Sequence, residues 1–322
     1  MTSKSNSNKS VNENTLEQKY LTEYFGSKKN KHELFLERKR NINKRAETIA
    51  DVPHPFLKWA GGKRQLINQF DQFFPTKFNK YIEPFVGGGA IFFYLLPNIA
   101  ILIDNNEELI NCYEVIQNNI LELIESLKKH KNEKNYFYKI RNLDRNPAEF
   151  NKLSDVERAS RIIYLNRVCY NGLYRVNSKG QFNVPFGLYK NPKICDRKNL
   201  LAVNKVLKNV KIFKSSFEKC LKFAEKGDFI YFDPPYQPIS DTANFTSYTE
   251  DNFGKDSQIK LFEIFKKCDE RRCKLMLSNS YNKFILDLYK DFNIETVLAK
   301  RAINTDATKR GNIKEVLILN YD

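Results

Sequence analysis

The residues best suited to chemistry are Asp233-Pro234-Pro235-Tyr236, which directly follow the apolar run 229–232. The lone pair of an adenine amino nitrogen is delocalised into the ring, so this nitrogen becomes a nucleophile only when acceptors hold its two hydrogens. The Asp233 carboxylate and the Pro234 carbonyl can accept one hydrogen each, and two successive prolines fix the backbone that places Tyr236. The Tyr236 ring can stack on a base rotated out of its duplex. A strand followed by a proline turn is the structural alternative, and the tetrapeptide alone leaves both interpretations open.

Two glycine-rich segments precede the tetrapeptide. Segment 55–64 places two glycines beside the single tryptophan, Trp59, and segment 81–90 reads as a short strand that runs into Gly87-Gly88-Gly89 and an apolar helix over 91–96. Glycine at a strand-to-helix turn lets the backbone approach a ligand closely, as in the nucleotide sites of doubly wound sheets. The apolar stretch 99–103 then ends at Asp104, whose carboxylate can accept hydrogen bonds from a ribose. This order suits a dinucleotide or an S-adenosylmethionine site.

The glycine spacing narrows the ligand classes. The run at 87–89 is by itself compatible with a flexible turn, and it departs from the G-x-G-x-x-G spacing of NAD and FAD sites. Neither glycine cluster has the GxxxxGK[ST] arrangement of a phosphate-binding P-loop. The six cysteines form no C-x-x-C pair and the three histidines are not spaced to join them, so we expect no metal site and reduced thiols.

Five motifs, in one order, resemble those of the Dam family of DNA adenine N6-methyltransferases. This family includes the GATC-specific enzymes of DpnII- and MboI-type restriction–modification systems. The resemblance covers about residues 53–322. Its motifs are the segment 55–66, Glu83-Pro84-Phe85 with the following glycines, the stretches 170–177 and 182–187, and Asp233 to Tyr236.

The resemblance implies roles for individual residues. The catalytic positions are Asp233, Pro234, Pro235 and Tyr236, and the positions that bind S-adenosylmethionine are Trp59, Lys63, Phe85, Gly87, Gly89, Asp104 and Asp233. The positions that contact DNA are Lys58, Tyr170, Asn171, Leu173, Arg175 and Pro185. Tyr170 matches an aromatic that inserts into the duplex near the flipped adenine. Arg175 matches a reader of guanine, because the arginine fork can donate to O6 and N7 together. Without the resemblance, core packing of the aromatics and solvated surface cations would be the simpler interpretations.

Two further sets of residues are expected near the DNA or the pocket. Lys309 and Arg310 lie in a basic loop that precedes the last predicted strand and is suited to phosphate contact. Ser278-Asn279-Ser280, at the end of another predicted strand, are expected to line the same pocket as Asp233.

The charge of the chain favours a polyanionic partner. There are 54 Lys and Arg residues against 38 Asp and Glu, a formal net charge of +16, which predicts salt-sensitive binding of duplex DNA. The basic residues are spread along the chain rather than gathered into one amphipathic helix. The longest nearly apolar stretch, 90–103, is shorter than a membrane span, and the first twenty residues contain no apolar block. We therefore expect a cytoplasmic monomer without a membrane partner.

The pattern of apolar runs predicts an α/β fold. From residue 80, short β-type runs alternate with helical stretches, which favours a parallel sheet flanked by helices. The predicted strands are 80–85, 99–103, 209–213, 228–232, 273–278, 293–298 and 314–320. One helix is predicted over 106–127, because apolar residues recur there at spacings of three or four. With the resemblance, this is a Rossmann-like S-adenosylmethionine-dependent methyltransferase fold with a mostly helical target-recognition lobe inserted.

The chain length predicts two lobes. We expect a basic and partly disordered N-terminal extension over 1–52, a catalytic domain formed by 53–112 and 205–322, and a DNA target-recognition domain over 113–204.

The sequence and the resemblance together predict a site-specific DNA adenine N6-methyltransferase. It would transfer the methyl group of S-adenosylmethionine to the adenine of GATC in duplex DNA, by base flipping and direct in-line displacement. A cognate restriction endonuclease would act on the same site without a stable complex. Two alternatives stay open: an amino methyltransferase acting on cytosine N4, RNA adenine or a protein glutamine amide, and a DNA-binding relative that has lost catalysis. Relatives with those other substrates more often begin the tetrapeptide with Ser or Asn, so Asp233 favours adenine.

Overall fold

The computed structural model describes residues 52–236, 253–300 and 312–321, together with Leu36, Glu37, Arg40 and Ile42. The chain divides into two compact units, 1–45 and 46–322. The four described residues of the first unit are helical. The rest of the predicted N-terminal extension up to residue 51, and the predicted DNA contacts Lys309 and Arg310, lie outside the described residues.

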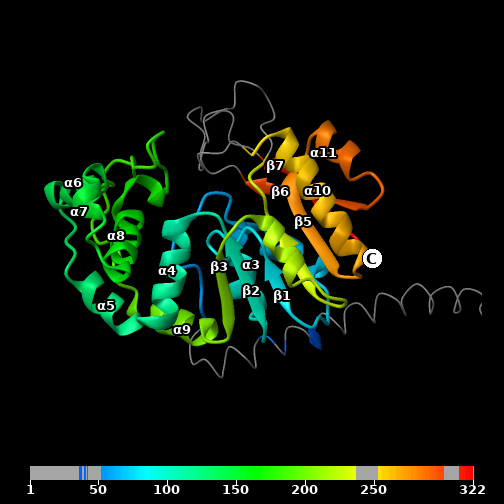
Figure 1. The fold of residues 1–322 in the computed structure, drawn as a ribbon, viewed down its shortest axis with the longest axis horizontal. Coiled ribbons are helices and arrows are strands. Elements are labelled where there is room, and N and C mark those ends of the chain that lie inside the picture. Colours follow the sequence, from blue (N-terminus) through cyan, green and yellow to red (C-terminus); the bar gives the residue numbers. More distant parts are fainter. Residues whose placement is uncertain are drawn as a thin grey trace, which may run out of the picture. The chain divides into compact units, whose positions relative to one another are not determined.

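A seven-stranded sheet forms the centre of the larger unit, with the strand order β3-β2-β1-β4-β5-β7-β6 (Figure 1). The strands are β1 (Tyr81–Glu83), β2 (Ala100–Asp104), β3 (Val210–Lys214), β4 (Phe229–Phe232), β5 (Lys274–Ser280), β6 (Asn293–Lys300) and β7 (Asn312–Leu319). All seven predicted strands are confirmed, with ends that shift by one or two residues. The predicted α/β class, with its Rossmann-like sheet, is confirmed.

The direction of one strand corrects the expectation of a parallel sheet. Strands β1 to β5 run parallel to one another, but β7 runs antiparallel to both β5 and β6. Only eleven residues separate β6 from β7, whereas a parallel connection needs a crossover of about a dozen or more residues, usually a helix. The sheet is therefore mixed, and β7 enters between β5 and β6.

Alternating side chains of the central strands fill two separate cores. Tyr81, Leu102 and Tyr231 belong to the larger apolar cluster, whereas Ile82 and Ile230 belong to the smaller one on the opposite face of the sheet. This alternation is the period of a strand, and burial on both faces is typical of parallel strands covered by helices.

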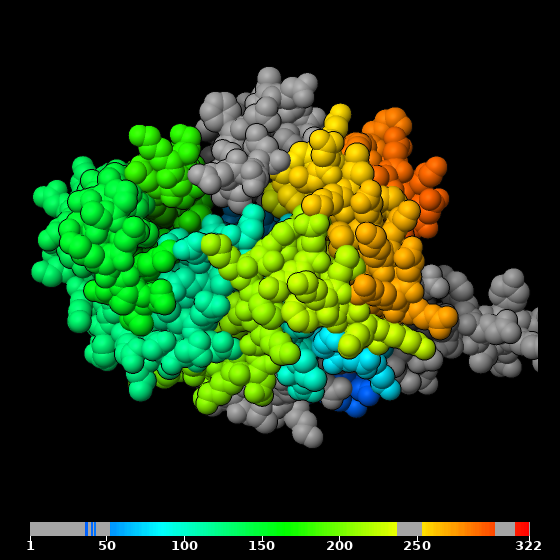
Figure 2. Space-filling model, in the orientation of Figure 1, coloured from blue at the N-terminus to red at the C-terminus, as the bar shows by residue number. Residues whose placement is uncertain are grey.

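Helices cover both faces of the sheet and the strand ends. The helices that accompany the sheet are α2 (Ile67–Phe70), α3 (Ala90–Leu95), α4 (Glu107–Asn118), α10 (Lys255–Glu270) and α11 (Lys283–Leu288), with the 3-10 helices η1 (Lys63–Leu66), η2 (Asp71–Phe73) and η5 (Phe217–Lys222). Side chains of α10 join the smaller core. In the space-filling view, α10 (yellow to orange) and the segment around η5 (yellow-green) adjoin each other over this face (Figure 2).

The single helix predicted over 106–127 is two helices in the structure, which corrects that prediction. α4 ends at Asn118 and α5 (Ile120–Lys128) follows, with Asn119 between them in a non-helical conformation at φ −127° and ψ 38°. The backbone N–H of Asn119 donates to Val115 and its carbonyl accepts from Leu123. The apolar period continues across the break because both helices bury their apolar faces in the same core, so periodicity alone does not reveal the change of direction.

The segment between α4 and β3 is mainly helical and is fully described. It contains α5, α6 (Lys134–Arg141), η3 (Asn142–Arg145), α7 (Pro147–Phe150), α8 (Asp155–Val168), η4 (Tyr170–Gly172) and α9 (Arg197–Leu207). α8 starts with a capping box formed by Ser154 and Glu157, an arrangement that satisfies the free N–H groups of the first turn. Most of its residues from Ala159 to Val168 are buried, so α8 forms the core of this segment (green in Figure 1).

Candidate active site

The carboxyl ends of neighbouring strands gather several polar side chains. Glu83 ends β1, Asp104 ends β2, Asp233 directly follows β4, and Ser278 lies near the end of β5. The chain passes from β1 outward to β2 and β3 and then returns to β4 on the other side of β1. Such a reversal of strand order is where open α/β sheets bind their ligands.

The Asp233 carboxylate is held from two other parts of the chain. Lys63 Nζ lies 2.7 Å from Asp233 Oδ1, and Ser278 Oγ donates to the same oxygen at 2.9 Å. Ser278 Oγ also lies 2.9 Å from the hydroxyl of Tyr231. Among the described residues, both contacts of this carboxylate go to Oδ1. The other oxygen, Oδ2, is thus left to accept a hydrogen from a substrate.

Burial and the neighbouring lysine act in opposite directions on Asp233. Burial raises the pKa of Asp233 above its usual range, while the Lys63 ammonium and the Ser278 hydroxyl oppose that rise. The Asp233 side chain keeps 19% exposure, against 5% for Lys63. The Asp233 carboxylate is therefore partly accessible to solvent and is paired with the buried ammonium of Lys63.

The rest of the tetrapeptide is fixed by α10 and β7. Gln258 Nε2 of α10 donates to the Pro235 carbonyl at 3.1 Å, and its Oε1 accepts from Asn279 Nδ2 at 3.0 Å. The Tyr236 hydroxyl donates to Glu315 Oε2 at 2.6 Å. Two contacts from separate elements thus hold the Pro235 carbonyl and the Tyr236 ring, and Asn279 of β5 orients Gln258.

Lys63 also faces the Tyr236 ring. Its Nζ lies 4.6 Å from the ring centroid and donates to the Gly61 carbonyl at 2.8 Å. The two segments that the sequence places 170 residues apart, around Lys63 and around Asp233, are therefore parts of one site.

The glycine loop after β1 packs against Trp59 and is fixed by Asp104. Gly87 has φ +47°, and a Cβ atom at this position would lie 2.8 Å from Trp59 Cδ1. Its N–H donates to Asp104 Oδ2 at 3.0 Å, and its carbonyl accepts from the Tyr113 hydroxyl at 3.0 Å. Gly89 has φ +69°, and a Cβ there would meet that hydroxyl at 2.6 Å. Glycine is therefore required at both positions.

Asp104 orients the loop and keeps acceptor capacity. Its Oδ1 accepts from the Asn106 N–H at 3.0 Å, so each carboxylate oxygen holds one backbone donor and retains a lone pair for a ligand. Burial raises the pKa of Asp104, and the backbone donors at Asn106 and Gly87 oppose that rise.

Glu83 adds a third carboxyl group to the strand ends. It is 2% exposed, and its Oε2 has no hydrogen-bond partner among the described residues. Burial raises the pKa of Glu83 well above its usual range, and the negative charges of Asp233 and Asp104 add to that rise. Asp104 and Asp233 therefore carry the acidic character of these strand ends, and burial favours the neutral form of Glu83.

Phe85 lies apart from Trp59, in an aromatic cluster. Its ring stacks on Phe217 at 5.3 Å between centroids and meets the edge of Phe253 at 5.7 Å. Trp59 instead stacks on Tyr174 at 4.8 Å. The predicted cofactor positions therefore include two different aromatic surfaces.

Asn166 of α8 links the backbone of Lys58, a predicted DNA contact, to η4, which contains the predicted contacts Tyr170 and Asn171. Asn166 Oδ1 accepts from the Lys58 N–H at 2.8 Å, and its Nδ2 donates to the carbonyls of Lys58 and Gly172 at 2.9 Å each. Tyr170, which is 56% exposed, donates its N–H to the Pro185 carbonyl at 2.9 Å. The predicted DNA contacts with exposed or half-buried side chains include Lys58, Tyr170, Asn171, Leu173, Arg175 and Pro185.

Several residues that complete this arrangement were not predicted from the sequence. Asn166, Gln258 and Glu315 are polar residues on two helices and a strand, and each is linked to a predicted position by a hydrogen bond. The one signal in the sequence that could have indicated them is a polar residue among apolar residues of a helix, since Asn166 and Gln258 are 1% and 0% exposed. Ser278, which is expected to line a pocket with Asp233, contacts the Asp233 carboxylate through its hydroxyl.

The described residues also lack two features. Within 52–236, 253–300 and 312–321, no group of three or more His, Cys, Asp or Glu side chains is arranged to hold a metal ion. Over the same residues no helix combines the length and apolar character needed to cross a membrane.

Comparison with known proteins identifies close relatives. A family model described as D12 class N6 adenine-specific DNA methyltransferase matches residues 59–303. The Type II methyltransferase M1.LlaDCHI of Lactococcus lactis subsp. cremoris is 48% identical over 271 residues, covering 83% of this chain and 95% of that protein. The Type II methyltransferase M.MjaIII of Methanocaldococcus jannaschii is 48% identical over 291 residues, covering 83% and 99%. The DNA adenine methylase of Escherichia coli K12 is 34% identical over 269 residues, covering 82% and 94%.

Proposed function

The chain belongs to the D12 class of N6 adenine-specific DNA methyltransferases, and on that premise we propose that it methylates the adenine of GATC in duplex DNA with S-adenosylmethionine as methyl donor. The family membership predicted from the five motifs is confirmed. The observation that carries the proposal is the Asp233 carboxylate, held through Oδ1 by Lys63 and Ser278 beside the fixed ring of Tyr236.

The donor set at the strand ends supports S-adenosylmethionine as the cofactor. Bound S-adenosylmethionine supplies a methyl group on a positively charged sulfonium, which in-line displacement removes without a covalent enzyme intermediate. The carboxyl groups of Asp104 and Asp233 suit the positive charges of this cofactor, and the buried Glu83 Oε2 has no hydrogen-bond partner among the described residues. Trp59, Lys63, Phe85, Gly87 and Gly89 complete the proposed cofactor site.

The tetrapeptide activates the amino group of the target base. Asp233 Oδ2 and the Pro234 carbonyl accept its two hydrogens, which frees the nitrogen lone pair for attack. The flipped adenine stacks on Tyr236, whose ring is already fixed by Glu315 and Lys63. A fixed ring and fixed acceptors need no reorganisation when the base arrives.

The residues around Asn166 recognise the duplex. Tyr170 inserts near the flipped adenine, and Arg175 reads a guanine with its fork. Lys58, Asn171, Leu173 and Pro185 contact the remaining part of the target, and Lys309 and Arg310 contact phosphate. In this scheme residues 113–204 are the target-recognition domain, and residues 53–112 and 205–322 are the catalytic domain.

The names of two relatives suggest a biological setting. Both are called Type II methyltransferases. We therefore propose a monomeric enzyme that protects sites cut by a separate restriction endonuclease, without a stable complex between the two proteins.

Transfer of labelled methyl from S-adenosylmethionine to two duplexes tests the proposed target. The duplexes have the same composition and differ only in GATC or a scrambled site. Incorporation into the GATC duplex alone supports the target. Equal incorporation into both duplexes would agree with the enzyme class but would contradict GATC as the target sequence.

A further inference from the structure

Residues 175–183 form a short antiparallel hairpin that begins with Arg175. Val176 pairs with Phe182 across it, and the N–H of Asn183 donates to the Arg175 carbonyl at 3.0 Å. The turn passes through Gly180 at φ +70°. An isolated hairpin this short is marginally stable at best, so the position of Arg175 depends on what holds the hairpin.

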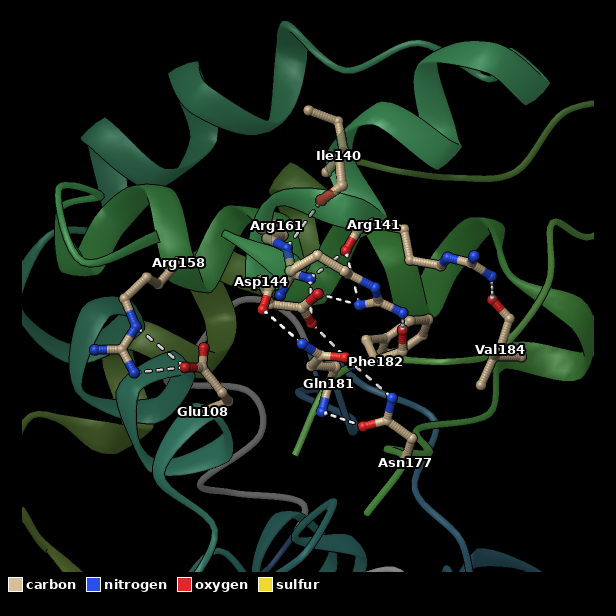
Figure 3. A network of polar contacts seen from close by, with 11 residues as sticks. Glu108, Ile140, Arg141, Asp144, Arg158, Arg161, Asn177, Gln181, Phe182 and Val184 are labelled. Carbon is tan, nitrogen blue, oxygen red and sulfur yellow. Dashed lines mark hydrogen bonds and ion pairs between the residues drawn. The ribbon is translucent and has the colours of Figure 1, made fainter. Parts of the chain in front are cut away.

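Two consecutive side chains of η3 clamp the hairpin at a single residue, Phe182. Asp144 Oδ2 accepts from the N–H of Phe182 at 2.8 Å, and the Arg145 guanidinium donates to the carbonyl of Phe182 at 2.5 Å. Gln181 Nε2 adds a hydrogen bond of 3.3 Å to the Asp144 carbonyl. Figure 3 shows Asp144, Gln181 and Phe182 close together, with their hydrogen bonds as dashed lines.

Asp144 and Arg145, which together form the clamp, are held to the helical segment by a buried arginine. Arg161 of α8 is 3% exposed at its side chain and pairs with Asp144 Oδ2 at 2.7 Å. It also donates to the carbonyls of Ile140 and Arg141 at 3.0 and 2.7 Å. Breaking a buried charge pair leaves an uncompensated charge and is strongly unfavourable, so Asp144 has little freedom to move.

A hydrogen bond to Asn183 fixes the orientation of the Arg175 side chain. Arg175 Nε donates to Asn183 Oδ1 at 2.7 Å, and Asn183 directly follows the clamped residue Phe182. A terminal nitrogen, Nη2, also lies 3.5 Å from the Asn183 carbonyl, so Nη1 and the second hydrogen of Nη2 are the donors that remain for a base. Bidentate recognition depends strongly on geometry, and a recognition residue needs support that locks its orientation.

We propose that Asp144 and Arg145 are positioning residues for base recognition, which fix the 175–183 hairpin so that Arg175 meets a guanine in the target. Asn183 completes the arrangement by orienting the guanidinium. This proposal rests on the proposed function, and specifically on guanine reading by Arg175.

The test compares kcat/KM on GATC with kcat/KM on a duplex in which the guanine–cytosine pair is replaced by adenine–thymine. Four proteins are compared: the wild type, Arg175→Ala, Arg145→Ala and the double variant. Arg145→Ala is expected to lower the ratio of the two kcat/KM values about tenfold, equivalent to roughly 1.4 kcal/mol. The double variant is expected to show the same ratio as Arg175→Ala, because the two residues act through one contact.

Arg158→Ala is the matched control. Arg158 lies on α8, pairs with Glu107 and Glu108, and is 22% exposed against 30% for Arg145. None of its contacts in the described part of the chain reaches residues 175–183. We expect Arg158→Ala to lower the melting temperature and leave the ratio unchanged. If Arg145→Ala does not fold, Asn183→Ala tests the same chain of contacts at a half-buried site, with the same expected loss.

The outcomes distinguish the positioning role of Asp144 and Arg145 from guanine reading by Arg175. An unchanged ratio in Arg145→Ala, or an additive loss in the double variant, overturns the clamp while Arg175 keeps its role. An equal loss of kcat/KM on both duplexes also overturns it, because a general structural role would act in that way. A ratio that stays high in Arg175→Ala overturns guanine reading by Arg175 itself, and with it the positioning role.

Discussion

Lys63 and Asp233 form a largely buried ion pair across the strand ends, with Nζ 2.7 Å from Oδ1. The same ammonium lies against the Tyr236 ring, so one side chain from the first glycine-rich segment contacts two residues of the tetrapeptide 233–236. In the proposed mechanism the Asp233 carboxylate accepts a hydrogen bond from the base, and its negative charge depends on Lys63.

Lys63→Met should shift the pH dependence of catalysis. Burial already raises the pKa of Asp233 and Lys63 opposes that rise, so removal of the cation should raise the pKa further. Activity falls as the pH drops through this pKa, and the acid limb of kcat/KM should therefore move to higher pH. A pH profile of methyl transfer measures the shift.

Lys80→Met provides the control for that profile. Lys80 forms ion pairs of 2.5 and 3.1 Å with Glu225 and Asp228 at the other end of β1 and β4. Its loss should leave the acid limb in place. An identical shift in both variants would show that the effect does not come from Asp233.

Gly87→Ala should disrupt the proposed cofactor site. An added Cβ would lie 2.8 Å from Trp59 Cδ1 at a residue with φ +47°, so the ring or the loop must move, and left-handed backbone is strained for alanine. We expect at least a tenfold weaker binding of S-adenosylmethionine, or about 1.4 kcal/mol, measured by titration calorimetry. Gly180→Ala is the control, because Gly180 also has positive φ but nothing lies within 4 Å of its added Cβ. Equal losses in both variants would contradict a role of the Gly87 loop in cofactor binding.

Tyr236→Ala and Tyr236→Phe should differ strongly in kcat/KM for DNA. Base stacking on an aromatic ring contributes about 1–3 kcal/mol, so the alanine variant should lose roughly 5- to 150-fold. The phenylalanine variant keeps the ring and loses only the hydrogen bond to Glu315, so its kcat/KM should fall much less than that of the alanine variant. Steady-state kinetics on the GATC duplex measures both, and similar losses would argue against stacking.

His130 should make stability depend on pH. Burial lowers the pKa of His130 to about 4, and its ring stacks on Tyr164 with both nitrogens near hydroxyl groups. The folded protein therefore keeps this ring neutral, while the unfolded chain takes up a proton below about pH 6.5. Stability from this group is fully present above that pH and is lost as the pH falls towards 4. Thermal melting between pH 7 and 4.5 should show a smaller fall for His130→Gln than for the wild type. Parallel curves would contradict the prediction.

The strands were predictable because apolar runs such as 229–232 are bounded by polar or turn residues. The direction of β7 was not predictable, since the periodicity of a strand does not show which strand it pairs with or in which direction. The break at Asn119 was missed because the apolar pattern continues through it.

The candidate site also has parts that the sequence predicts and parts that it does not. The tetrapeptide and the glycine loops have local signatures, whereas the roles of Lys63, Glu315, Asn166 and Asp144 depend on partners far away in the chain. No local pattern encodes those distances. Contacts of Lys309 and Arg310 with phosphate stay a prediction, because both residues lie outside the described part of the chain.

The most direct test of the central claim is the identity and rate of the nucleoside product. DNA containing GATC is incubated with S-adenosylmethionine and the wild type or Asp233→Ala, digested to nucleosides and analysed by mass spectrometry. We expect N6-methyladenine from the wild type and a rate at least roughly 10²-fold lower from Asp233→Ala, the scale of losing a key polar group in a preorganised site. N4-methylcytosine, no methylated nucleoside, or an undiminished rate in Asp233→Ala would contradict the account.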